Sequence, residues 1–488
     1  MLGCVVLLAV APRLSAQERG AAALGELIDG LGTTTRVMMI GAHPDDEDTQ
    51  LIAYLAKARH IETAYLSLTR GDGGQNLIGN ELGQSLGMIR TEELLAARRI
   101  DGGRQYFTRA FDFGFSKSID ETYEHWPKDS ILKDMVAIVR AFRPQVIIAV
   151  WSGTPQDGHG HHQYSGVLAR EVFDAAADSI RFRPSSVGGL APWATAKFYR
   201  ARLTTAGGLR FNVGEYDALL GRTYSEIATE SRSEHRSQGQ GGLPQRGPRF
   251  DAVRLEVSRV SDASAGNERG LFDGLDSSWS RFKDVRLADS VRAAVDSLPV
   301  VERLVRQALD LKDPSKVAEP LVRYVRVASR AASGIACATL TPTGSQTACS
   351  ATLGDLALAL ASTRARASEA LLDASGVTVE ATAPRELIAE RDTLTVVVSV
   401  YNQGKTPFVL ERLSFLDQPG SMSPPTTVLP DSVARKTLVY RAGSDPTFPW
   451  WLKSPRYRDT FSQPLSEMVV GEDRLFSSGV DEIGRAHV

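Results

Sequence analysis

One imidazole and four carboxylates stand together near the start of the chain. The segment is Gly41-Ala42-His43-Pro44-Asp45-Asp46-Glu47-Asp48. Histidine and carboxylate together suit Zn²⁺, with Fe²⁺ as the alternative. Two adjacent aspartates allow a division of roles, because one can bind the metal while the other takes a proton. The first turn of a helix also favours acidic residues, but that explanation leaves the preceding His43-Pro44 unexplained.

A second group of imidazoles lies about 115 residues further along, in Gly158-His159-Gly160-His161-His162. A histidine-rich loop by itself is often only a solvated loop. Together with His43 and Asp46, however, one histidine of this group would give three protein ligands. Catalytic zinc sites keep three protein ligands and leave one position open for water. The two segments together therefore predict a metal site.

The elements around these segments predict how they meet. Apolar runs typical of strands alternate with segments of helical composition, at 36–40, 51–58, 62–68, 85–100, 131–142, 145–150 and 164–177. This order predicts an α/β domain of the Rossmann-like type, with a mostly parallel sheet covered by helices on both faces. Both histidine segments follow predicted strands. We expect them at the carboxyl edge of the sheet, where ligands bind in open α/β folds.

After the α/β segments, the composition and the pattern of apolar residues change twice along the chain. We assign residues 30–260 to the α/β domain, 261–375 to a helical domain rich in Ala, Leu and Arg, and 376–488 to a β-sandwich-like domain with alternating strands. The last six residues, Ile483-Gly-Arg-Ala-His-Val488, can be encoded by a widely used sequencing-adapter string. This predicts that the C-terminal domain is truncated.

The N-terminus predicts export. An apolar run is followed by the small residues Leu14-Ser15-Ala16, so residues 1–16 read as a signal peptide. No basic segment precedes the run, which leaves open an upstream start and a lipid anchor on Cys4. In an exported protein, Cys337 and Cys349 favour a local disulfide, with two buried thiols as the alternative. We expect a periplasmic or extracellular protein.

Composition limits the class of protein to which the chain can belong. The 488 residues correspond to about three domains, and 42% hydrophobic with 23% charged residues is typical of a folded globular protein. Lys plus Arg number 56 against 58 Asp plus Glu, for a net charge of −2. Nucleic-acid-binding domains usually carry a basic excess, so we expect no nucleic-acid partner.

Ala42-His-Pro-Asp-Asp-Glu47 resembles the signature of the LmbE/PIG-L deacetylases, the family of N-acetylglucosaminyl-phosphatidylinositol de-N-acetylase. The second segment resembles the family's Gly-His-Pro-Asp-His motif, but it keeps only the His-x-x-His spacing. Segment 87–97 is similar to the family's helix that carries Arg and Glu. The resemblance covers residues 35 to about 240.

The resemblance implies a role for each motif position. His43, Asp46 and His162 would bind zinc, and Asp45 would be the general base that activates the metal-bound water. His159 would stabilise the oxyanion or protonate the leaving amine. Because Pro-Asp is missing from the second motif, the third ligand is His162 on spacing, with His161 as the alternative.

Three further residues are candidates for contacting substrate. They are Arg90, Asp112 and His235. Asp112 lies in an aromatic-rich loop after a predicted strand. The alternative for Arg90 is a salt bridge on the helix surface, and the alternative for His235 is a solvated segment. Trp126, Trp151 and Tyr164 could form a sugar-stacking wall, with core packing as the alternative.

The sequence thus predicts an exported zinc-dependent N-deacetylase acting on an N-acetylated amino sugar or glycoconjugate. Two alternatives stay open: a metal-dependent hydrolase of another amide or of a phosphoester, and a non-catalytic carbohydrate-binding protein on the same scaffold. The C-terminal domains are candidates for association with the cell envelope. The sequence leaves the oligomeric state open.

Overall fold

The structure is a computed structural model. It describes residues 20–201, 208–261, 268–335, 349–411, 425–444 and 446–472. The predicted signal peptide, residues 1–16, lies outside these ranges. Cys349 is disulfide-bonded, whereas its predicted partner Cys337 lies outside the described residues.

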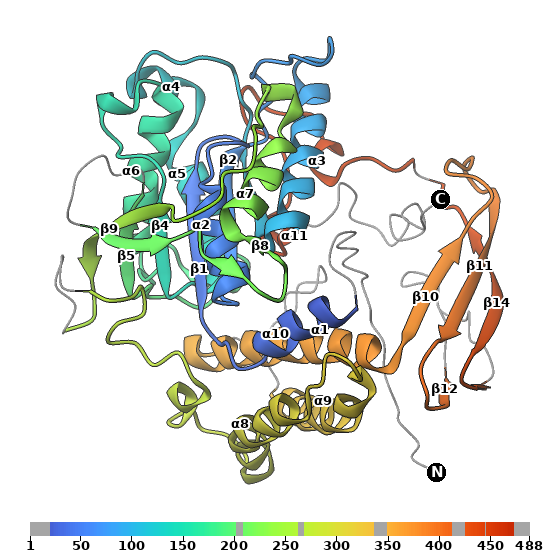
Figure 1. Ribbon diagram of the computed structural model, residues 1–488. Coiled ribbons are helices and arrows are strands. Elements are labelled where there is room, and N and C mark those ends of the chain that lie inside the picture. Colours follow the sequence, from blue (N-terminus) through green and yellow to red (C-terminus); the bar gives the residue numbers. More distant parts are fainter. Residues whose placement is uncertain are drawn as a thin grey trace.

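A seven-stranded sheet forms the centre of the molecule (Figure 1). In spatial order its strands are β3 (Arg104–Ala110), β2 (Glu62–Thr69), β1 (Arg36–Gly41), β4 (Val146–Ala149), β5 (Lys197–Arg200), β9 (Phe250–Ser258) and β6 (Leu209–Asn212). The first five run parallel, and β9 and β6 are antiparallel additions at one edge. The predicted mostly parallel α/β sheet is therefore confirmed.

Both faces of the sheet are covered, as the side chains of β1 show. Successive side chains of a strand point to opposite faces of its sheet. All six residues of β1 are buried, so its side chains are covered on each face. Met38 and Ile40 pack into one core with α5 (Lys128–Phe142) and α6 (Gly160–Ala175). The alternate residues Val37 and Met39 pack into the core on the other face.

Three helices line that second face. They are α2 (Thr49–Ala53), which continues into a π-helical turn at Tyr54–Ala58, α3 (Gln84–Asp101) and α7 (Tyr224–Ser233). A short helix, α4 (Ile119–His125), packs on α6, and a small ribbon joins β7 (Tyr216–Asp217) to β8 (Arg222–Thr223).

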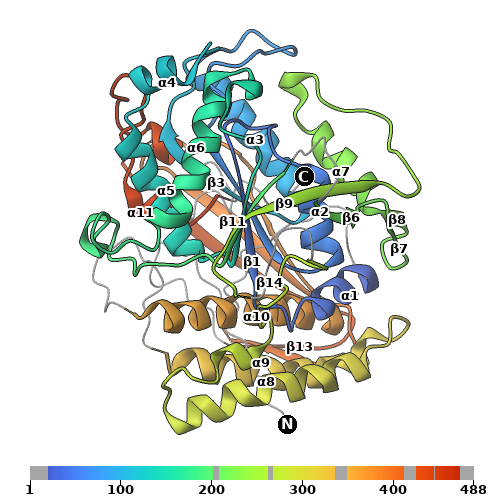
Figure 2. The same ribbon diagram turned by 90° about the vertical axis from the view of Figure 1, so that its left-hand side faces the viewer.

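A helical group packs beneath the sheet. It contains α8 (Asp289–Ala308), α9 (Ala318–Ser333) and α10 (Ala351–Ser375). The N-terminal helix α1 (Ala21–Asp29) joins their core through Leu24 and Ile28. In both Figure 1 and Figure 2, α10 lies nearest the sheet, with α8 and α9 beyond it.

The buried Asp355 of α10 fixes the helical group to the sheet. It accepts hydrogen bonds from Arg36 at the start of β1 and from Arg281. The helical group therefore covers the amino ends of the strands, and the carboxyl ends, where the two histidine segments emerge, lie at the opposite end of the sheet.

The C-terminal strands are antiparallel, as predicted. One sheet has the order β10 (Val377–Thr382), β11 (Thr393–Asn402), β14 (Ser432–Arg441), and a two-stranded ribbon pairs β12 (Phe408–Leu410) with β13 (Thr426–Val428). Leu410 and Val428 of the ribbon share a core with the larger sheet. This shared core is consistent with a small sandwich.

Residues 446–472, which we call the C-terminal strap, depart from the predicted arrangement. They do not extend the antiparallel strands but return to the α/β domain, where α11 (Leu465–Met468) packs on α5 and β3. Their backbone also bonds to the edge strand: Glu472 N donates to Gln105 O at 2.7 Å and Phe461 N to Arg109 O at 2.7 Å. The strap thereby covers an edge that would otherwise expose unpaired backbone groups.

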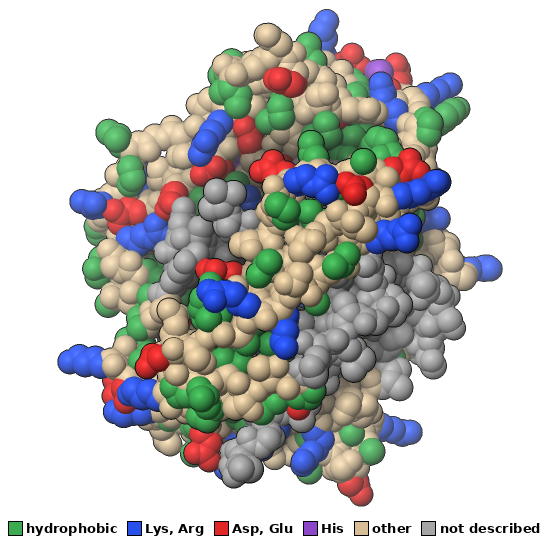
Figure 3. Space-filling view, turned by 90° about the vertical axis from the view of Figure 1, so that its right-hand side faces the viewer, with side chains coloured by type: hydrophobic (Ala, Val, Ile, Leu, Met, Phe, Trp, Pro, Cys, Tyr) green, Lys and Arg blue, Asp and Glu red, His purple; other side chains and the backbone are tan. Residues whose placement is uncertain are grey.

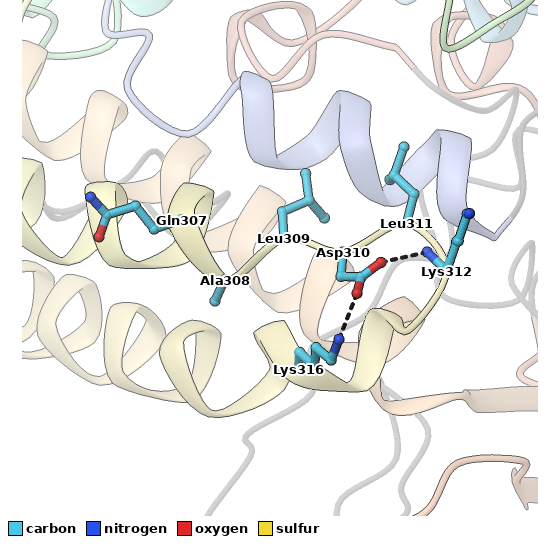
Figure 4. Close-up of a pocket in the computed structure, with 7 residues that line it drawn as sticks. All are labelled: Gln307, Ala308, Leu309, Asp310, Leu311, Lys312 and Lys316. Carbon is cyan, nitrogen blue, oxygen red and sulfur yellow. Dashed lines mark hydrogen bonds and ion pairs between the residues drawn. The ribbon is translucent and has the colours of Figure 1, made fainter.

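No helix in the described part of the chain is long and apolar enough to cross a membrane. On the face shown in Figure 3, basic and acidic side chains are interspersed. A surface hollow opens at the end of α8, lined by seven residues, Gln307 to Lys312 and Lys316 (Figure 4). Asp310 accepts hydrogen bonds there from Lys316 Nζ at 2.6 Å and from the backbone N–H of Lys312 at 3.0 Å.

Candidate metal centre

The loop between β1 and α2 turns its two aspartates in different directions. Asp46 folds back, so that its Oδ2 accepts the backbone N–H of Ala42 at 2.9 Å and of His43 at 2.8 Å. Asp45 has a φ of 97°, which is rare for a residue with a Cβ. This strained turn leaves the Asp45 side chain partly exposed while Asp46 is buried.

Three side chains converge beyond the carboxyl ends of β1 and β4. His43 Nδ1 lies 3.3 Å from Asp46 Oδ2, and His162 Nε2 lies 3.4 Å from Asp46 Oδ1. One ligand atom from each residue lies within 4.8 Å of the others. Two imidazoles and a carboxylate fit the donor set of a three-ligand zinc site. The structure therefore brings together the three residues that were predicted to bind a metal.

The charged groups of this cluster shift one another's pKa values. Burial raises the pKa of Asp46, but His43 and His162 outweigh burial and hold it well below its ordinary value. Burial likewise lowers the pKa of His43, yet the carboxylates of Asp46 and Asp112 leave it raised. A carboxylate that stays ionised while buried is suited to bind a cation.

His162 is fixed by Trp151, for which the sequence suggested sugar stacking or core packing. The two rings stack with their centroids 3.7 Å apart and an interplanar angle of 8°. Trp151 Nε1 also donates to Asp46 Oδ2 at 3.0 Å. On its other side, His162 Nδ1 lies 3.2 Å from the backbone oxygen of Asp157. A metal-binding histidine commonly bonds a carbonyl through its second nitrogen.

A second cluster shares one residue with the first. His43, His159 and His161 also bring one ligand atom each within 4.8 Å of the others. His161 is fully buried, whereas His162 is half-buried. Both histidines considered for the third ligand position therefore lie beside His43.

His159 begins α6 as its N-cap. Its Nδ1 accepts a hydrogen bond from the backbone N–H of His161 at 3.1 Å. Burial, with a contribution from His43 and His162, lowers its pKa to about 3. The ring is therefore neutral near pH 7, and since Nδ1 accepts, Nε2 carries the proton.

Asp45 is held by groups from two helices and a loop. Arg90 of α3 donates from Nη2 to Asp45 Oδ1 at 2.9 Å, and Gln240 Nε2 lies 3.3 Å from Oδ2. Arg232 of α7 donates to the backbone oxygen of Asp45. Sequence reasoning missed Gln240 and Arg232. Arg232 lies in the same polar segment as the predicted substrate residue His235. No local pattern in the sequence indicated that Arg232 contacts Asp45.

The three predicted substrate residues differ in their surroundings. Arg90 is 3% exposed and faces Asp45 and the oxygens of Pro44 and Gly71. Asp112, also buried, has Oδ2 3.8 Å from His43 Nε2. His235 is completely buried, with Nε2 2.7 Å from Glu47. Their roles toward a substrate stay predictions.

Trp126 and Tyr164 pack in the core. Both are completely buried. The indole N–H of Trp126 donates to the Phe111 oxygen at 2.9 Å, and its ring lies 4.1 Å from that of His161. Tyr164 packs against Trp126, with the ring centroids 5.4 Å apart, and neither aromatic offers a surface for a sugar.

Comparison with known proteins agrees with this geometry. The family model described as PIG-L, GlcNAc-PI de-N-acetylase, matches residues 38–173. The chain carries a PIG-L family domain. The matched range begins in β1 and ends in α6, so it includes every member of both histidine clusters.

Curated relatives of the PIG-L domain are named as deacetylases and amidases. A 1D-myo-inositol 2-acetamido-2-deoxy-alpha-D-glucopyranoside deacetylase of Geodermatophilus obscurus is 31% identical over 34% of this chain and 60% of its own length. A diacetylchitobiose deacetylase of Thermococcus kodakarensis is 29% identical over 32% of this chain and 56% of its own. The chain thus spans less than two thirds of the length of these relatives.

A solved structure, the N,N'-diacetylchitobiose deacetylase of Pyrococcus horikoshii, is 21% identical. The match covers 42% of this chain and 70% of that one, with a TM-score of 0.32.

Proposed function

We propose that the protein is a zinc-dependent N-deacetylase that hydrolyses the acetamide of an N-acetylated amino sugar or glycoconjugate to an amine and acetate. The observation that carries the proposal is the separation of Asp45 from Asp46. Asp46 faces His43 and His162, whereas the adjacent Asp45 is partly exposed and pairs with Arg90. A binding protein would have no need of this second carboxylate.

Three of the chain's side chains would hold the metal. They are His43, Asp46 and His162. Bound Zn²⁺ would polarise the amide carbonyl and lower the pKa of water at the site. Fe²⁺ is the alternative for the same ligand set.

Asp45 would act as the general base. It takes a proton from the water as the oxygen attacks the acetyl carbon, and it returns that proton to the nitrogen as the carbon–nitrogen bond breaks. Arg90 and Gln240 fix the two carboxylate oxygens for this role. The strained backbone of Asp45 is held in place by Arg232.

His159 would stabilise the oxyanion. Because its Nδ1 accepts from the backbone N–H of His161, its Nε2–H is available to donate to the oxygen that becomes negatively charged. Of the two roles that the resemblance implied for His159, this geometry supports the hydrogen-bond donor. A neutral imidazole has no extra proton to give to the leaving amine.

Acetate release tests the proposal. The purified chain from Gln17, loaded with Zn²⁺, would be incubated with a panel of N-acetylglucosamine conjugates, and the product amine would be identified by mass spectrometry. Release of acetate that disappears on Asp45→Ala while the metal is retained supports the proposal. A panel of other amides and of phosphoesters tests the alternative hydrolases, and bound ligand without turnover would indicate a carbohydrate-binding protein.

We also propose that the protein is exported, on the evidence of the signal-like segment 1–16. Cell fractionation with N-terminal sequencing of the mature chain tests this. A mature chain beginning near Gln17 in the periplasm or medium supports export, and one beginning at Cys4 with a lipid attached supports an anchor. Association of the C-terminal domains with the cell envelope stays a prediction.

A further inference from the structure

The two ring nitrogens of His43 face different partners. Nδ1 lies 3.3 Å from Asp46 Oδ2, on the side where His162 also approaches. Nε2 lies 2.9 Å from His161 Nδ1. His43 would therefore hold a metal shared with Asp46 and His162 through Nδ1, while its Nε2 faces His161.

Distances separate a ligand pair from a hydrogen-bonded pair. Two nitrogens that bind one tetrahedral zinc at about 2.0–2.1 Å stand roughly 3.3 Å apart. The Asp46 carboxylate lies 3.3 Å from His43 Nδ1 through Oδ2 and 3.4 Å from His162 Nε2 through Oδ1, distances close to that spacing. The 2.9 Å between His43 and His161 is shorter, and it equals the usual length of a hydrogen bond.

A histidine that binds metal through one nitrogen keeps its proton on the other. That N–H is commonly donated to a carboxylate, which fixes the ring and strengthens the ligand. The carboxylate available here is Asp112, but its Oδ2 is 3.8 Å from His43 Nε2, too far for a hydrogen bond. His161 is nearer by almost 1 Å and can accept through Nδ1.

The start of α6 explains why His161 occupies this position. Gly160 N donates to Ser116 O at 2.8 Å, a bond that proline could not make. A Cβ on residue 160 would lie 2.2 Å from Ser118 O. This close contact requires glycine at residue 160, and the next residue, His161, is completely buried against Trp126 and Phe113.

We infer that His161 is not a metal ligand but a positioning residue, which accepts the Nε2–H of His43 and so fixes that ring for metal binding. The inference deepens the proposed function and rests on its metal site. The rival arrangement uses the second cluster, with His43, His159 and His161 as ligands. In that arrangement His161 would be essential for binding and His162 would not.

Zn²⁺ affinity distinguishes the two arrangements. It would be measured on the full chain by competition with a chromophoric chelator, for wild type, H162N, H161L and H161N. We expect H162N to lose tight binding altogether and H161L to weaken it 10- to 100-fold, the usual effect of removing such a partner. H161N, whose side-chain oxygen can accept the same hydrogen bond, should return the affinity to within about threefold of wild type.

Two controls accompany the series. D112N removes a nearby charge but no hydrogen bond, so it should weaken the affinity less than H161L does, because the Asp112 carboxylate lies 3.8 Å from His43 Nε2 and is too far away to accept its proton. Thermal unfolding of each metal-free variant identifies those that fail to fold, and H161N then carries the test if H161L does not fold.

Three results would overturn the inference. One is an unchanged affinity in H161L. Another is loss of metal in both H161L and H161N while H162N still binds, which would make His161 a ligand. The third is a wild type that binds no Zn²⁺, which would remove the proposed function as well. Metal binding that follows the expected series without acetate release would refute only the proposed function.

Discussion

Arg90 donates a hydrogen bond from Nη2 to Oδ1 of Asp45 at 2.9 Å, across 45 residues of sequence. The same guanidinium also bonds the backbone oxygens of Pro44 and Gly71. Arg90 thereby ties the loop after β1 to the loop after β2. The acid that we propose as the base is oriented by a buried cation rather than left free in solvent.

Asp45→Asn should lower the rate of acetate release by at least 10²-fold, because the amide cannot take a proton. Zn²⁺ affinity should stay within about threefold of wild type, since Asp45 belongs to neither cluster of ligand atoms. Asp46→Asn is the matched variant, and it should lose both metal and activity. Loss of metal in Asp45→Asn would contradict the division of roles.

Arg90→Gln should lower kcat about 10- to 100-fold with a smaller change in KM, because a misplaced base costs rate rather than binding. Steady-state kinetics on the substrate found by the panel measure both constants. Arg90→Lys keeps the charge but cannot reproduce the three contacts at once, so it should recover only part of the rate. A rise in KM alone would instead indicate that Arg90 binds substrate.

Glu472→Ala should destabilise the α/β domain by about 3–5 kcal/mol, because it leaves the charge of Arg70 buried and unpaired. Arg70 is completely buried, pairs with Glu472 and lies 3.5 Å from the ring centre of Trp451. Urea unfolding followed by tryptophan fluorescence measures the change.

The control for this variant is Asp296→Ala, which breaks an exposed pair with Arg292 in α8. Exposed pairs contribute at most about 1 kcal/mol. If Glu472→Ala is no more destabilising than Asp296→Ala, the strap does not contribute to the stability of the domain.

Because of Asp72, the free energy of unfolding should decrease as the pH rises from about 4 to about 7. Burial, with the nearby charge of Asp112, raises its pKa to about 7. Between its ordinary value and 7 the folded state binds a proton that the unfolded state does not, so the free energy of unfolding decreases as pH rises. Asp72→Asn removes this titration and should flatten the dependence, as unfolding at a series of pH values would show. A slope unchanged by Asp72→Asn would disprove the assignment.

Removing metal should lower the unfolding temperature. A ligand that binds only the folded state at about 100 times its Kd adds about 2.7 kcal/mol. Calorimetry with excess Zn²⁺ and then with chelator should show this shift in wild type. It should be absent in His43→Ala, and an equal shift in that variant would place the metal elsewhere.

Short-range patterns determined much of this protein. The run Arg36–Ile40 and the buried segment Gln145–Val150 predicted β1 and β4 to within a residue or two. Because parallel strands end at one edge of a sheet, His43 and His162 were expected to meet, and they do. Alternation and apolar runs depend on neighbours in the sequence, so the sequence by itself carries them.

Only the tertiary structure decided which atoms face which. Nothing in the sequence places Arg232 and Gln240 on Asp45, closes Trp151 over His162, or turns His161 toward Nε2 of His43. Nor does composition show that the C-terminal strap returns to β3 and pairs Glu472 with Arg70, 402 residues earlier. Such contacts join distant segments, and they depend on how whole elements pack, which no local pattern encodes.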